Sequence, residues 1–162
     1  MKRFPLILIA ALIALSSCME DKENSWEEQL RWRENNLVWL GEQAERKNDD
    51  GTPYYTKVVP DWDKKAYVLV HYFNDRSLTQ GNLSPLYTST VDVKYRGELY
   101  DGTAFDSSYN NVPPTYPADS IFRTGLSGVI SGWQIVLQDM RVGDTCEVVI
   151  PYSLAYGTSQ SG

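Results

Sequence analysis

The candidate side chains for chemistry lie between Val91 and Gly157, and they combine aromatic rings with one carboxylate. They are Tyr95, Phe105, Asp106, Trp133 and Tyr156. Aromatic rings supply an apolar surface that excludes water, whereas the carboxylate can accept hydrogen bonds. Each residue also has an ordinary structural explanation, because large aromatic side chains mostly serve packing, and Asp-Ser or Tyr-Gly pairs are typical of caps and turns. The residue types alone therefore leave core packing and a binding site open.

Other kinds of site have little support in the sequence. The sole histidine, His71, lies in an apolar run typical of a strand, without a cluster of metal ligands in the sequence around it. The glycines between Gly125 and Gly132 lack the spacing of a phosphate-binding loop. The chain carries a formal net charge of −6, whereas nucleic-acid binding requires clustered Lys and Arg. No metal, cofactor or nucleic acid is therefore expected.

The elements that must position the candidates follow from hydrophobic periodicity. Val91, Val93 and Tyr95 alternate with charged residues, as in a half-buried strand. The Asp101-Gly102 pair is typical of a tight turn, and it predicts an antiparallel hairpin that presents Tyr95 and Phe105 to one region.

A short helix is predicted from Ile130, and a turn at Val142-Gly143-Asp144 ends it. Its apolar residues at helical spacing are Trp133, Val136, Leu137 and Met140. Residues 66–73 are expected to form the first strand, and Cys146, Val148 and Ile150 alternate as in a last one. Strands in this order around one helix predict an α+β fold with an antiparallel sheet.

Five motifs in this order resemble the FKBP-type peptidyl-prolyl isomerases. They occupy residues 91–97, 101–108, 129–133, 140–144 and 150–157, the last combining Ile-Pro-Tyr with Ala-Tyr-Gly. The resemblance covers residues 91–157, extends back to Tyr67 and does not concern residues 1–60. It implies an FKBP-like fold in which the sheet wraps around the short helix. A shallow apolar pocket between sheet and helix would hold the substrate proline.

The resemblance implies a role for each candidate. Trp133 would form the floor of the pocket, and Asp106 would be its carboxylate. The walls would be Tyr95, Phe105, Val129, Ile130 and Tyr156, and Phe122 would also contact the substrate. The backbone N–H of Ile130 and the hydroxyl of Tyr156 would hold the carbonyl oxygens that flank the proline. Asp106 would orient the peptide or polarise its amide, or else pair with a cation such as Arg123 and hold the shape of the site.

The implied reaction is rotation about an X-Pro amide, which meets a barrier of roughly 18–20 kcal/mol. An apolar pocket favours the twisted transition state because it strips water from the amide carbonyl. The expected function is peptidyl-prolyl cis-trans isomerisation that assists the folding of exported proteins. Its ligands would be proline-containing polypeptides and macrolide inhibitors. The alternative is a non-catalytic FKBP-like binding module or chaperone in an envelope complex.

Three features depart from the family pattern. Ser120 occupies a position where family members commonly carry an aromatic residue, so one pocket wall is expected to be thinner. A proline-rich loop, residues 109–120, is expected to reshape the rim, and its Tyr116 could supply the missing ring. The family continues past residues 155–157 with a flap and a final strand, so we expect that the sequence to Gly162 is truncated.

The first residues resemble a bacterial lipoprotein signal. Lys2 and Arg3 precede an apolar run too short to span a bilayer comfortably, and small residues stand before Cys18. We expect residues 1–17 to be cleaved and Cys18 to carry a lipid anchor. Loss of Lys2 and Arg3 would change the formal charge from −6 to −8. Cys146 would then be the only free thiol, which excludes an internal disulfide.

Acidic residues follow Cys18 directly and resemble a surface-export signal of some Gram-negative lipoproteins. The expected location is therefore the bacterial cell envelope, at the periplasmic or the surface face of the outer membrane.

Residues 18–60 are expected to form a lipid-anchored linker and helical arm, followed by the domain at residues 61–162. Ser25 and Glu28 have the spacing of a capping box. An apolar stripe at helical period comprises Trp26, Leu30, Leu37, Leu40 and Ala44. Trp32 and Trp39 fall on another face. That face would pack against the domain, or bind a second protomer, a client, a lipid interface or a glycan.

Overall fold

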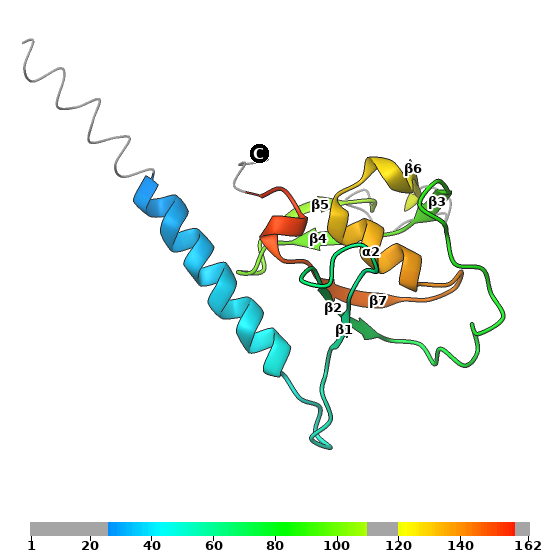
Figure 1. Ribbon diagram of the computed structural model, residues 1–162, viewed down its shortest axis with the longest axis horizontal. Coiled ribbons are helices and arrows are strands. Elements are labelled where there is room, and N and C mark those ends of the chain that lie inside the picture. Colours follow the sequence, from blue (N-terminus) through cyan, green and yellow to red (C-terminus); the bar gives the residue numbers. More distant parts are fainter. Residues whose placement is uncertain (1–25, 110–119, 158–162) are drawn as a thin grey trace, which may run out of the picture. The chain divides into compact units, whose positions relative to one another are not determined.

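The computed structural model describes residues 26–109 and 120–157 (Figure 1). The signal segment, Cys18, the cap at Ser25, Tyr116 and the end of the chain lie outside these residues. Residues 26–45 form the first helix, and within the described ranges no helix combines the length and apolar character needed to cross a membrane. The other elements are β1 (Thr56–Val58), β2 (Val68–Tyr72), β3 (Thr90–Val93), β4 (Arg96–Glu98), β5 (Ala104–Ser107), β6 (Phe122–Gly125), η2 (Leu126–Gly128), α2 (Ser131–Asp139), β7 (Cys146–Val149) and η3 (Tyr152–Leu154).

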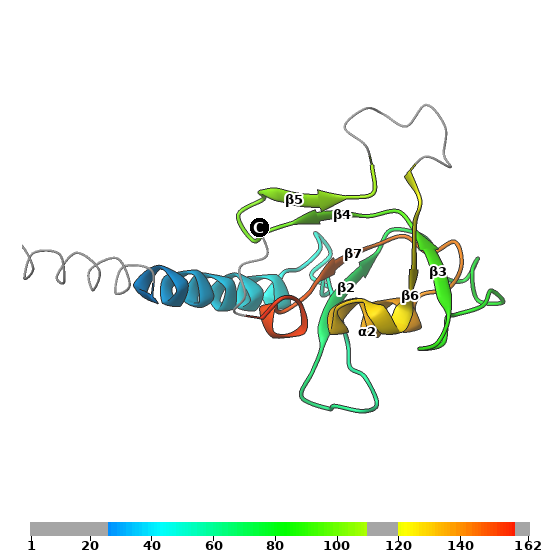
Figure 2. The same cartoon turned by 90° about the horizontal axis from the view of Figure 1, so that it is seen from above.

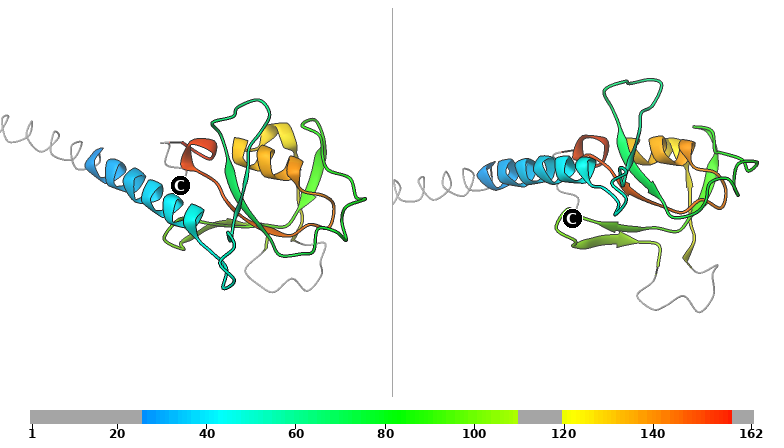
Figure 3. Two further views of the ribbon diagram at one scale, coloured as in Figure 1. Left: turned by 60° about the horizontal axis from the view of Figure 1, so that its bottom comes forward. Right: turned by 90° about the horizontal axis from the view of Figure 1, so that it is seen from below.

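The strands pair antiparallel throughout. One sheet has the order β1-β2-β7 (Figure 1), while β3 pairs with β6 and β4 pairs with β5 (Figure 2). Helix α2 lies across the β2 and β7 region in the views of Figure 3. The predicted α+β fold is therefore confirmed, and so are the hairpin around Gly102 and the short helix after Ile130.

Strand β2 is central because it is apolar on both faces. Val68 and Val70 point into a core cluster that includes Ile135 and Val136 of α2. Leu69 points to the opposite face, where it packs with Tyr55 and other residues. All three β2 residues are fully buried, so the consecutive apolar run reflects burial on two sides. His71 also lies on β2, as its sequence neighbours predicted.

The second cluster includes the end of the first helix. Trp39, Leu40 and Ala44 pack against Tyr55 and Leu69. Trp39 therefore packs against the domain, which is the first alternative given for its face, and it does so beside Leu40 and Ala44 of the expected apolar stripe. A helix end beside a sheet buries a stripe broad enough to include such neighbouring positions.

Two strand predictions need correction. β1 precedes the strand over residues 66–73 that was expected to be first. Its residues are few and partly polar, so it gives little periodic signal. The strand expected over residues 91–95 ends at Val93, and a new strand begins at Arg96 with a different partner. Tyr95 therefore lies in the break between β3 and β4.

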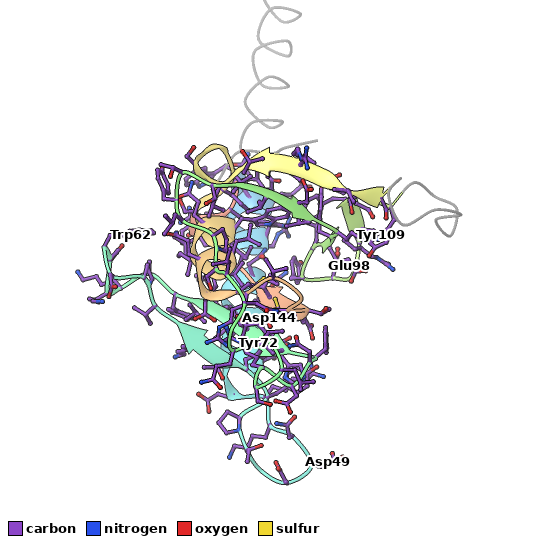
Figure 4. The ribbon with its side chains drawn as sticks, turned by 90° about the vertical axis from the view of Figure 1, so that its right-hand side faces the viewer. Asp49, Trp62, Tyr72, Glu98, Tyr109 and Asp144 are labelled. Atoms are coloured by element: carbon purple, nitrogen blue, oxygen red, sulfur yellow. The ribbon has the colours of Figure 1, made fainter. Side chains whose placement is uncertain are left out.

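A polar cluster ties the turn after α2 to the segment after β2. The side chain of Asp144 has no exposed surface, and Arg76 Nε lies 3.3 Å from its Oδ2. Asp144 also accepts hydrogen bonds from the Thr79 hydroxyl (2.6 Å), the Asn74 amide (3.1 Å) and the Arg141 N–H (2.9 Å). Figure 4 shows Asp144 close to Tyr72, over whose ring the Arg76 guanidinium lies.

Helix α2 approaches Ile150, the residue directly after β7, closely at Gly132. A Cβ atom at this position would overlap Cγ2 of Ile150. We expect Gly132→Ala to lower the free energy of unfolding by about 1–3 kcal/mol, because a well-packed core accepts extra volume poorly. The matched control is Gly41→Ala, a helical position with no atom within 4 Å, which is expected to stabilise by up to about 1 kcal/mol. Urea unfolding would measure the free energy of unfolding of both variants. If the two substitutions changed it in the same direction, the close-packing argument would be contradicted.

Candidate functional site

Three aromatic rings from separate elements meet at the start of α2. Trp133 lies in the first turn of α2, Phe122 begins β6, and Tyr95 lies between β3 and β4. The Tyr95 ring centroid is 4.8 Å from that of Trp133, with the planes at 83°. Phe122 lies 5.6 Å from Tyr95 and 6.2 Å from Trp133. These edge-to-face contacts fix the three rings relative to one another.

Asp106 joins this group through Tyr95. The Tyr95 hydroxyl donates a hydrogen bond to Asp106 Oδ2 at 2.6 Å, and the N–H of Ser107 donates to Asp106 Oδ1 at 2.8 Å. Partial burial, together with the hydrogen bond and the charge of Asp106, raises the pKa of Tyr95 to about 12. Tyr95 therefore remains a neutral hydroxyl at ordinary pH, and the carboxylate of Asp106 is held at the edge of the aromatic cluster.

The expected alternative pairing of Asp106 with Arg123 is wrong. Arg123 instead pairs with Asp92, which faces it across β3 and β6, through two hydrogen bonds of 2.7 Å each. Because this exposed ion pair is bidentate, it uses both sides of the Arg123 guanidinium fork that face Asp92.

Phe105 and Tyr156 form a second, more exposed aromatic pair. Their ring centroids are 6.2 Å apart with perpendicular planes. Both side chains keep nearly half of their surface exposed. The Phe105 ring lies over Gly97, where an added Cβ would come within 2.7 Å of its Cζ. The absence of a side chain at Gly97 thus allows the ring to lie flat on the hairpin. Tyr156 also makes a small contribution to the raised pKa of Tyr95.

Val129 and Ile130 lead into α2. The carbonyl of Val129 accepts a hydrogen bond from the Gln134 side chain at 2.8 Å, and the carbonyl of Ile130 accepts one from the Trp133 N–H at 3.0 Å. Among the residues that the structure describes, none accepts a hydrogen bond from the Ile130 N–H. This N–H is one of the donors that a helix start leaves without an intrahelical partner.

Ser120 is almost fully buried, with 1% of its surface exposed. A small polar side chain therefore fills the position where an aromatic ring was expected. Phe122, two residues later, keeps a partly exposed ring against Tyr95 and Trp133.

Two serines that the sequence analysis did not include hold the backbone of Tyr95. The Tyr95 N–H donates to Ser108 Oγ at 2.9 Å, and its carbonyl accepts from the Ser108 N–H at 3.0 Å and the Ser107 hydroxyl at 3.2 Å. The available signal was their position directly after Asp106, since serine hydroxyls readily replace backbone partners in irregular segments.

Taken together, the cluster offers an apolar surface with few polar atoms. The rings of Tyr95, Phe122 and Trp133 provide the surface, Asp106 provides one carboxylate, and the Ile130 N–H provides a donor. Such an arrangement can bind an apolar group next to a carbonyl oxygen. The side chains that meet there include no nucleophile paired with a general base.

Comparison with known proteins places this arrangement in a family. Residues 82–162, half of the chain, match the model of the family "FKBP-type peptidyl-prolyl cis-trans isomerase". A "Macrophage infectivity potentiator" of Trypanosoma cruzi is 43% identical over 82 residues, which cover 51% of this chain and 38% of that protein. A "Peptidyl-prolyl cis-trans isomerase Mip" of Coxiella burnetii is 43% identical over 75 residues, covering 46% and 29%.

An "Outer membrane protein MIP" of Legionella longbeachae is 42% identical over 79 residues, which cover 48% of this chain and 30% of that protein. The chain thus spans less than half the length of each of these relatives. The family match begins before β3 and includes every candidate residue from Tyr95 to Tyr156. The chain therefore belongs to the FKBP-type peptidyl-prolyl cis-trans isomerase family.

Proposed function

We propose that this protein accelerates cis-trans isomerisation of X-Pro peptide bonds in exported polypeptides. The observation that carries the proposal is the meeting of Tyr95, Phe122 and Trp133 at the start of α2, with Asp106 bonded to Tyr95. Family membership supports the same activity, and so does the printed name of the Coxiella relative.

In this proposal the proline ring rests on Trp133, between Tyr95 and Phe122. Water is excluded from the amide there, which favours the twisted amide over the planar, more charge-separated one. The Ile130 N–H and the Tyr156 hydroxyl hold the carbonyl oxygens on either side of the proline. Phe105 and Val129 complete the walls. The reaction requires no covalent bond to form or break, which agrees with a site rich in rings and poor in acids and bases.

Asp106 acts in this proposal through its contact with Tyr95 and through its negative charge at the rim. Asp106 fixes the Tyr95 ring against Trp133. Its negative charge also interacts with the dipole of the X-Pro amide and favours the orientation that this dipole has in the twisted amide. The hydrogen bond of 2.6 Å supports the first role.

A second candidate function is binding without turnover, as a chaperone or as part of an envelope complex. The small, buried Ser120 favours this second function, because the pocket wall at this position lacks the aromatic ring that would contact the proline. Proline-containing segments would then bind without faster rotation.

The same proposal includes the location and the ligands. We infer an anchor at a lipidated Cys18 in the cell envelope, supported by the signal-like residues 1–17 and by the name of the Legionella relative. Macrolide inhibitors are expected ligands, and the name of another relative, "FK506-binding protein 2" of Debaryomyces hansenii, supports this expectation.

The test is the rate of cis-to-trans conversion of a short X-Pro peptide with the protein from residue 19 onward, including any continuation after Gly162. Acceleration by the wild type is expected, and Asp106→Ala is expected to lower kcat/KM about tenfold, because it frees the Tyr95 ring. Asp92→Ala, which removes an exposed carboxylate from a strand outside the cluster, is the matched control and should leave the rate unchanged. A folded wild type that binds the peptide without acceleration would establish the binding module instead.

A further inference from the structure

Tyr95 lies at a point where the sheets give its backbone no regular partner. Strand β3 pairs with β6 up to Val93, and β4 begins its pairing with β5 at Arg96. A partly buried N–H or C=O that lacks a partner costs roughly 1–3 kcal/mol, so a residue in such a break either finds other partners or moves. The position of the Tyr95 ring therefore depends on what holds its backbone.

Ser108 supplies nearly all of these partners. Its Oγ accepts the Tyr95 N–H at 2.9 Å, its own N–H donates to the Tyr95 carbonyl at 3.0 Å, and its hydroxyl lies 3.4 Å from the same carbonyl. Both residues are half-buried, which limits the ability of water to replace these bonds. The Ser107 hydroxyl adds one contact, at 3.2 Å, and it also accepts a bond from the Tyr109 N–H.

One short segment thus holds both ends of Tyr95. Asp106 binds the hydroxyl at the tip of the side chain, and Ser108, two residues later, binds the backbone at its base. Between these two points the ring makes its contact with Trp133, at a centroid distance of 4.8 Å. A shift at the base would turn the ring about its fixed tip and change the surface offered to a ligand.

We infer that Ser108 is a positioning residue of the isomerase site, which acts through the backbone of Tyr95 to hold its ring against Trp133. The inference rests on the proposed function, but it makes a structural claim that can be tested without turnover. Ser108→Ala removes the acceptor of the Tyr95 N–H while leaving the Ser108 backbone bond in place. We expect kcat/KM to fall about tenfold, since displacement of a positioning contact by about 1 Å can cost up to about 100-fold.

The experiment compares three variants of the full-length protein. Ser108→Ala removes the hydroxyl, and Ser108→Thr restores one. Ser89→Ala is the matched control, because Ser89 is also half-buried and its Oγ accepts one backbone N–H, that of Leu86 at 3.0 Å, in the loop before β3. For each, kcat/KM is measured with an X-Pro peptide, and the pKa of the Tyr95 phenol is measured by NMR of isotope-labelled tyrosine, assigned with Tyr95→Phe.

The expected result has three parts. Ser108→Ala lowers kcat/KM and moves the pKa of Tyr95 from about 12 toward its ordinary value. Ser108→Thr recovers most of the wild-type kcat/KM and most of the raised Tyr95 pKa. Ser89→Ala changes neither quantity. A folded Ser108→Ala protein with an unchanged Tyr95 pKa would overturn the inference. If the wild type proves inactive, the proposed function fails, while the Tyr95 pKa still decides whether Ser108 positions the ring.

Discussion

Replacing Trp133 with alanine is expected to lower kcat/KM for an X-Pro peptide about 100-fold, equivalent to about 2.7 kcal/mol of transition-state stabilisation. The indole contacts both Tyr95 and Phe122, so its removal opens the floor of the aromatic cluster and admits water. The loss should appear in kcat as well as in KM, because exclusion of water from the amide acts on the transition state. The measurement is the peptide isomerisation rate at several substrate concentrations.

The matched control is Trp39→Ala. Trp39 is also a half-buried tryptophan, but it packs in the cluster around Tyr55 and Leu69, on the opposite face of β2 from α2. Truncation of a large aromatic side chain costs about 3–5 kcal/mol at a fully buried site, and we expect less for both of these residues. Only Trp133→Ala should reduce the activity of the folded protein. Equal activity of the two folded variants would contradict the assignment of Trp133 to the site.

Replacing Asp144 with alanine is expected to lower the free energy of unfolding by about 2–5 kcal/mol at neutral pH, mainly because partly buried donors lose their acceptor. The Thr79 hydroxyl and the Arg141 N–H lose the Asp144 carboxylate, whereas Arg76 keeps its ion pair with Asp139. Asp144→Asn keeps the shape of the side chain and should cost less, so it remains measurable if the alanine variant does not fold. Asp92→Ala removes the exposed partner of Arg123 and should cost at most about 1 kcal/mol. Urea unfolding of the three variants compares these values.

The same cluster predicts a dependence on pH. Burial alone would raise the pKa of Asp144, but the hydrogen bonds from Thr79, Arg141 and Asn74 and the charge of Arg76 outweigh it and lower the pKa. The unfolded chain then binds this proton more readily than the folded one. The stabilisation is therefore present above the unfolded value of about 3.9 and is lost as the pH falls through the lower, folded value. Unfolding of wild type and Asp144→Asn should converge between about pH 5 and pH 2, and a constant difference would contradict this.

Local sequence patterns predicted those parts of the fold that depend on neighbouring residues alone, such as a tight turn or an amphipathic helix. The hairpin around Gly102 was predictable because Asp-Gly turns are conformationally specific, and Gly102 has a positive φ of 84°. Helix α2 was predictable from the spacing of its apolar residues. β1 was not, since Thr56-Lys57-Val58 is too short to show a period, and it becomes a strand through its pairing with β2.

The candidate site depended on information that periodicity does not carry. The alternation of Val91, Val93 and Tyr95 predicted one continuous strand, but the change of pairing partner after Val93 is a tertiary effect. The partner of Asp106 could not be identified, because both Tyr95 and Arg123 are plausible by type and only the cross-strand register assigns Arg123 to Asp92. Family resemblance grouped the aromatic residues, and the geometry supplied their contacts.

The pairing of β2 with β7 has a consequence for folding during synthesis. Leu69 of β2 is opposite Val149 of β7, roughly 80 residues later, so a nascent chain leaving the ribosome at about 5–20 residues per second waits roughly 4–16 s before β2 gains this neighbour. During that interval its apolar residues Val68, Leu69 and Val70 have no partner on that edge. Until β7 has been synthesised, this edge of β2 therefore remains open to pairing with other strands.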